Sequence, residues 1–78
     1  MKPNHVAVES SHIASIGHDG AETMEVTYKG KGEAPGATYA HTPITVKEHS
    51  TIMQRIFDGE SAGRIIRNLD VRGVRLGD

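Results

Sequence analysis

Residues 43–57, Pro-Ile-Thr-Val-Lys-Glu-His-Ser-Thr-Ile-Met-Gln-Arg-Ile-Phe, decide the fold, because here the spacing of apolar residues becomes helical. The side chains that recur at steps of three and four are Val46, His49, Ile52, Met53, Ile56 and Phe57. Such steps place residues on one face of a helix. Thr45 followed by Glu48 fits a capping box, which starts a helix by pairing two free backbone donors. Asp58-Gly59 is the expected end, since glycine readily adopts the left-handed conformation.

Upstream of this segment the pattern has a period of two. Residues 23–29 alternate apolar and polar side chains, as a strand with one buried face requires. We expect further strands at residues 6–8, 13–16 and 37–41. His18-Asp19-Gly20 supplies a turn, and the glycine-rich residues 30–36 form a hairpin loop.

Downstream, Ser61 is placed to cap a second, shorter helix whose apolar residues are Ala62, Ile65, Ile66 and Leu69. Residues 70–78 form either a terminal strand or an arm that packs on a neighbour. The sequence therefore predicts a single α+β domain over residues 1–78. We expect a small antiparallel sheet of three to four strands, followed by one longer and one short helix packed on one face.

The composition excludes several classes of protein. The 78 residues carry a formal charge of −1, and there is no cysteine for a disulfide or a thiolate metal site. The apolar runs are two or three residues long, far below the roughly 20 needed to span a bilayer. The N-terminus lacks the apolar core of a secretory signal. We expect a cytoplasmic protein with no membrane partner.

Five motifs, taken in order, resemble the KTSC family, a small module found at the C-terminus of some lysyl-tRNA synthetases. They are Ser10-Ser11-x-Ile13, Ile16-Gly17-His18-Asp19, Met24-Glu25-Val26-x-Tyr28, Tyr39-Ala40-His41 with Pro43, and Ser61-Ala62-Gly63-Arg64 with Arg67-Asn68. The resemblance covers about residues 10–69. It implies a binding domain for nucleic acid. The family's aromatic pair Tyr-x-Tyr corresponds here to Tyr39 and His41.

The distribution of arginine is the strongest local signal for a ligand. The arginines are Arg55, Arg64, Arg67, Arg72 and Arg75, all in the last third of the chain. The candidate phosphate-binding residues are Ser61, Arg64, Arg67 and Asn68. On a helix these arginines share one face, and the Ser61 end adds backbone donors, so a phosphate could bind there. Alternatively, the arginines form a solvated face and pair with Glu60 or Asp70.

Tyr39 and His41 lie two residues apart and therefore on one face of the expected strand. Exposed, they would form a stacking platform for the bases of a nucleic acid. Buried, they would be part of the core beneath the helices. The chain has three aromatic residues, Tyr28, Tyr39 and Phe57, so a domain of this size needs most of them inside.

The histidines invite a metal-binding or acid–base interpretation. They are His5, His12, His18, His41 and His49. None is spaced like a known pair of local ligands, and no His-Glu-x-x-His element occurs. The sequence therefore predicts no metal, no cofactor and no catalytic residue.

Two hypotheses follow. The first is a non-enzymatic module that binds nucleic acid or a nucleotide through the arginine-bearing helix face and the strand at residues 37–41. The alternative is a phage- or prophage-type protein that acts through protein–protein contacts, as an inhibitor or as a small oligomer, with residues 71–76 as an arm. Small cores are often reinforced by oligomerisation, which motivates the second hypothesis.

Overall fold

Alternating apolar and polar residues build a β-sheet from the first half of the chain, and the helical spacing of the second half builds two helices. The computed structural model describes residues 4–30 and 35–76. Its elements are β1 (Asn4–Ala7), β2 (Ile13–His18), β3 (Met24–Lys29), β4 (Pro35–His41), α1 (Val46–Phe57), α2 (Ala62–Arg67) and β5 (Gly73–Leu76). Among the described residues, no helix is long and apolar enough to cross a membrane.

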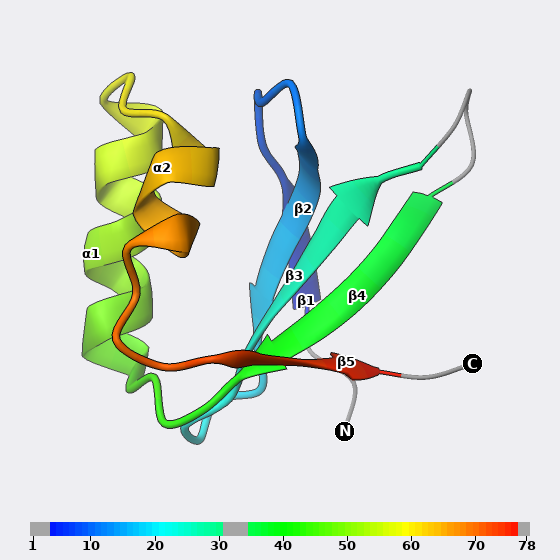
Figure 1. Cartoon of the computed structure of the whole chain (residues 1–78). Helices are drawn as coiled ribbons and strands as arrows, with labels where there is room; N and C mark the ends of the chain where they lie inside the picture. The colour runs from blue at the N-terminus through cyan, green and yellow to red at the C-terminus, as the bar shows by residue number, and fades with distance from the viewer. Residues whose placement is uncertain (1–3, 31–34, 77–78) are drawn as a thin grey trace.

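The strands form one sheet in the order β1-β2-β3-β4-β5, with every neighbouring pair antiparallel. β5 follows both helices and returns to the edge of the sheet, where Val74 lies opposite Ala40 of β4 (Figure 1). The α+β class is confirmed. The expected three to four strands are corrected to five, because residues 73–76 form the terminal strand. That segment has four residues, Gly-Val-Arg-Leu, and is too short for its own pattern to decide between a terminal strand and an arm.

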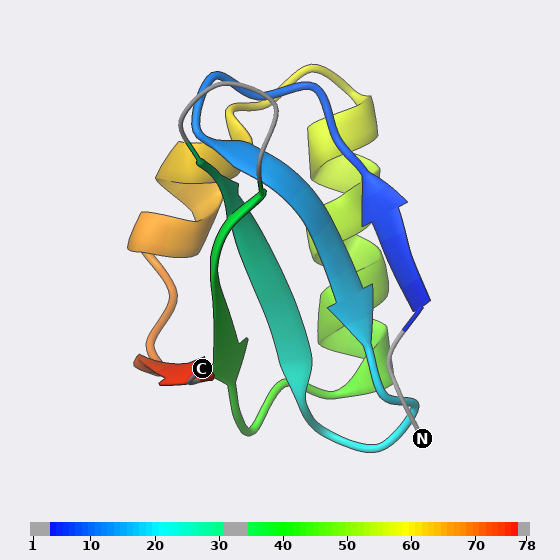
Figure 2. The same cartoon turned by 90° about the vertical axis from the view of Figure 1, so that its right-hand side faces the viewer.

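Both helices cover one face of the sheet and leave the other face open (Figure 2). The core lies between these two layers. The strands, the loop after β1 and the segment before α1 contribute Val8, Ile13, Ile16, Met24, Val26 and Ile44. The two helices contribute Ile52, Met53, Ile56, Ala62, Ile65 and Ile66. Burial of each larger aliphatic side chain stabilises the fold by about 1.5–3 kcal/mol.

The start of α1 shows the predicted capping box. The backbone N–H of Glu48 donates to the Thr45 hydroxyl at 3.1 Å, and the backbone N–H of Thr45 donates to the Glu48 carboxylate at 3.2 Å. The helix ends at Phe57, with Asp58 as its C-cap. Gly59 then adopts a φ of 104°, in the left-handed region that glycine enters without steric cost.

α2 begins as predicted, since the Arg64 N–H donates to the Ser61 hydroxyl at 3.3 Å. It ends at Arg67, earlier than the sequence pattern suggested, and Asn68 is its C-cap. The N–H of Leu69 donates to the carbonyl of Ile66, so the last turn tightens to an i→i+3 bond. Leu69 packs on the core from outside the helix.

β4 begins at Pro35, two residues before the expected strand. The tip of the predicted hairpin loop, residues 31–34, lies outside the described residues. The nearest described pair in the ladder is Lys29 with Pro35, and the register shifts just before it. The hairpin therefore joins β3 and β4 as the sequence indicated.

Candidate functional site

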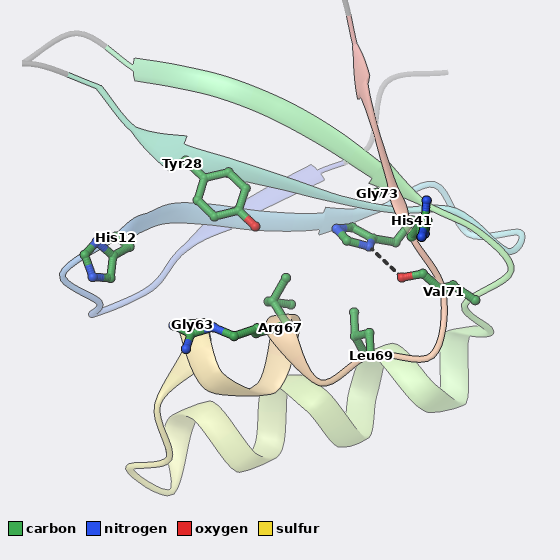
Figure 3. A pocket seen from close by; sticks show the side chains of 10 residues that line it. His12, Tyr28, His41, Gly63, Arg67, Leu69, Val71 and Gly73 are labelled. Carbon is green, nitrogen blue, oxygen red and sulfur yellow. Dashed lines mark hydrogen bonds between the residues drawn. The ribbon is translucent and has the colours of Figure 1, made fainter.

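A cleft separates α2 and the segment after it from the β3–β4 side of the sheet. Its volume is about 610 Å³, within the roughly 300–1,000 Å³ typical of small-molecule sites. The lining residues are His12, Tyr28, His41, Gly63, Ile66, Arg67, Leu69, Val71, Arg72 and Gly73. We call it the α2 cleft. Figure 3 shows side chains from the sheet and from α2 facing each other across it.

The charged side chains that line the α2 cleft are both arginines. Two arginines, Arg67 and Arg72, and two histidines, His12 and His41, border it, and no aspartate or glutamate is among its lining residues. A wall of Ile66, Leu69 and Val71 completes it. Guanidinium groups beside an apolar wall, with no competing carboxylate, suit an organic anion.

His41 is the buried polar residue of the cleft, at 5% exposed. Its Nδ1 lies 3.4 Å from the carbonyl oxygen of Val71 (Figure 3). A carbonyl can only accept, so Nδ1 carries the hydrogen and donates it. The other ring nitrogen, Nε2, is buried without a hydrogen-bond partner. Buried polar atoms are rarely left in this state.

Tyr28 and Tyr39 form an edge-on aromatic pair with ring centroids 5.6 Å apart. Burial, and secondarily the Tyr39 phenol, raise the pKa of Tyr28, so its hydroxyl stays protonated and able to donate. Tyr39 lies opposite Val26 in the ladder and is half-buried, on the sheet face that the helices cover. With His41 on that same face and buried, the pair does not form an exposed stacking platform.

The predicted phosphate-binding residues do not share one face. Ser61, Arg64 and Arg67 border a groove beside residues 9–12, whereas Ser61, Arg64 and Asn68 border another beside α1. Neither of these two grooves, nor the α2 cleft, holds Arg67 and Asn68 together. Consecutive helical positions differ by about 100°, and Asn68 lies past the last helical residue. Arg67 alone of the four reaches the α2 cleft.

Glu60 is engaged by Arg55. The Arg55 guanidinium donates to the Glu60 carboxylate through Nη2 at 2.7 Å and through Nε at 3.0 Å and 3.1 Å. These bonds lower the pKa of Glu60. Within the described part of the chain, neither Arg64 nor Arg67 forms an ion pair. The predicted pairing of these two arginines with Glu60 or Asp70 is therefore wrong, and both guanidiniums face solvent.

A polar row that no sequence pattern indicated crosses β1, β2 and β3 on the open face. His5 bonds to the Ser15 hydroxyl through Nδ1 at 2.8 Å and to the Glu25 carboxylate through Nε2 at 2.9 Å. This order of groups resembles a nucleophile, a base and an orienting acid. None of the three lines a described cleft. We interpret the row as cross-strand contacts that hold β1 to the sheet.

Comparison with known proteins adds no further identification. No protein-family model, curated protein or solved structure matches the chain significantly. The resemblance to the KTSC family therefore stays a prediction from its motifs. Within residues 4–30 and 35–76, no three histidine or carboxylate side chains converge as metal ligands.

Proposed function

We propose that this protein is a non-enzymatic binding module for a nucleotide or a nucleic-acid strand, and that the α2 cleft is its binding site. The observation that carries the proposal is the lining of the cleft, which combines two arginines, two histidines and a tyrosine with no carboxylate. A nucleotide joins an anionic phosphate to a flat, partly apolar base. Both parts have counterparts in this cleft.

Arg67 supplies the phosphate contact. It is exposed and has no carboxylate partner in the described chain, so its planar guanidinium is available for two parallel hydrogen bonds. The apolar wall of Ile66, Leu69 and Val71 takes the sugar and base by excluding water. The protonated hydroxyl of Tyr28 adds a neutral donor.

Arg64 lies on the route by which a longer strand would leave this cleft. It borders the groove that Arg67 also borders, between α2 and residues 9–12. Successive phosphates of a strand would therefore meet Arg67 first and Arg64 next. A mononucleotide in the α2 cleft would use Arg67 without Arg64.

The experiment is a calorimetric titration of the protein with adenosine 5′-monophosphate and with a short single-stranded oligonucleotide, at two salt concentrations. For each phosphate that the protein neutralises, the slope of log K against log salt concentration becomes more negative by about 0.7–0.9. Arg67→Gln should weaken binding of the mononucleotide about tenfold or more. Arg64→Gln is the matched control from the same helix, and should weaken only the oligonucleotide. Absence of binding, or equal effects of both variants on the mononucleotide, contradicts the proposal.

A second candidate function is self-association or protein binding through β5. Val74 and Leu76 are 64% and 44% exposed. They belong to β5, which is an edge strand of the sheet and pairs with β4 through Ala40 and Thr38. Exposed apolar edge strands readily pair with another chain. The phage-type interaction hypothesis places its contact here.

Light scattering after size-exclusion chromatography tests this candidate. The full chain should be larger than a monomer, and the double variant Val74→Lys, Leu76→Lys should be monomeric with its fold retained. A parent chain that stays monomeric at high concentration would contradict self-association. Binding to a different protein would then be tested by a pull-down that compares the parent chain with the same double variant.

A further inference from the structure

We propose that His41 determines which nucleotide the α2 cleft accepts, by receiving at Nε2 a hydrogen bond that the base or the sugar of the ligand donates. The inference rests on the proposed function and goes one step further, since it assigns a specificity-determining residue and the chemical feature it recognises. It predicts selection for a ligand with an N–H or O–H group remote from its phosphate.

The first support is the hydrogen-bonding state of the ring. The Val71 carbonyl fixes the hydrogen on Nδ1, so Nε2 of the neutral ring is an acceptor. This acceptor has no partner, although the residue is 5% exposed. A ligand donor placed at Nε2 would remove the cost of burying it unpaired.

The second support is the glycine beside the ring. A β-carbon at position 73 would lie 2.8 Å from both Cε1 and Nε2 of His41, and 3.2 Å from Cβ of Tyr39. The backbone of Gly73 does not have a positive φ. Glycine is therefore required here by space and not by conformation. Its missing side chain lets the ring edge that carries Nε2 stay in place, because any β-carbon at this position would displace the ring.

The third support is the arrangement of the two recognition groups. In Figure 3 the Arg67 side chain runs toward His12, while His41 lies at the other end of the cleft with Tyr28 between them. Arg67 and the acceptor Nε2 of His41 therefore lie toward opposite ends of the cleft. A mononucleotide has the matching layout, because its phosphate and the donors of its base or sugar lie at opposite ends of the molecule.

The experiment compares four probes by calorimetry: adenosine 5′-monophosphate, purine riboside 5′-monophosphate, 2′-deoxyadenosine 5′-monophosphate and ribose 5-phosphate. If the base amino group is the donor, the adenosine nucleotide binds about tenfold more tightly than the purine riboside nucleotide. If the sugar 2′-hydroxyl is the donor, the adenosine nucleotide binds more tightly than the deoxynucleotide, by a similar factor. His41→Phe keeps a ring and removes the acceptor, so it should abolish that preference.

Two further measurements keep the test independent of how well that variant folds. In the unaltered protein, the ¹⁵N resonance of His41 Nε2 should shift upfield when the preferred nucleotide binds. Gly73→Ala should reduce the same preference by filling the space beside Nε2. Binding of all probes with equal affinity, or a preference that survives in His41→Phe, overturns this inference while the proposed function stands. Failure of every probe to bind overturns both.

Discussion

His18 ties the end of β2 to the segment that leads into α1, because its Nε2 donates a hydrogen bond of 2.6 Å to the carbonyl oxygen of Ile44. Its other nitrogen, Nδ1, accepts from the backbone N–H of Gly20 at 3.0 Å. Both nitrogens are therefore used and the tautomer is fixed. His18, which the sequence predicted to lie in a turn with Asp19 and Gly20, therefore also positions the first helix.

Replacing His18 by phenylalanine should lower the free energy of unfolding by about 1–3 kcal/mol. The reason is that the carbonyl of Ile44, a residue whose side chain packs in the core, loses its hydrogen-bond donor. Urea denaturation followed by circular dichroism measures this loss. His12→Phe is the control, since His12 is exposed and a surface change stays within about 0.5 kcal/mol. Equal stability of the two variants would show that the His18 bond contributes nothing.

A pH dependence follows from His49, whose ring centroid lies 5.0 Å from that of His18. Burial, and secondarily the charge of His18, lower the pKa of His49 in the folded state. The unfolded chain therefore binds the proton more readily, and stability should fall as pH decreases below about 6.5. The pKa values of Asp19 and Glu60 are also lowered, but their ordinary values of 3.8 and 4.5 place their effect at more acidic pH.

Thermal unfolding between pH 7.5 and 5.5 measures this dependence. His49→Gln should show a flatter profile than the parent chain across that interval, with the difference growing toward pH 5.5. Parallel profiles for the two proteins would assign the acid sensitivity to other groups.

The capping box of α1 gives a third prediction. Thr45→Ala removes the hydroxyl that accepts from Glu48 N–H, and should cost about 1 kcal/mol of stability. Thr45→Ser keeps the acceptor and should retain most of the stability. If serine and alanine destabilise the protein equally, the loss comes from packing of the threonine methyl group and not from the cap.

The features that the sequence predicted correctly are local. The Thr45–Glu48 box spans one turn, and the alternation along residues 24–29 is visible within a single strand. The features it did not predict depend on distant residues. His41 and Val71 are 30 positions apart, and His5 is 10 and 20 positions from Ser15 and Glu25.

The candidate site shows the same division. Helical spacing grouped Arg64 with Arg67 correctly as neighbours, since they border one groove. It could not show that α2 stops at Arg67 or that Asn68 lies toward α1. The return of β5 to β4 brings Gly73 against His41, and this pairing of strands completes the cleft. No pattern within residues 70–76 indicates that this segment pairs with β4.

The most direct test of the account is an amide chemical-shift map of ¹⁵N-labelled protein titrated with adenosine 5′-monophosphate. Binding in the α2 cleft predicts the largest shifts at His12, Gly63 and Gly73, from three separate segments that line it. The open face of the sheet, reported by Ser15 and Glu25, should not respond. Shifts concentrated on that face, or no shifts at millimolar nucleotide, would contradict the assignment of the α2 cleft as the binding site.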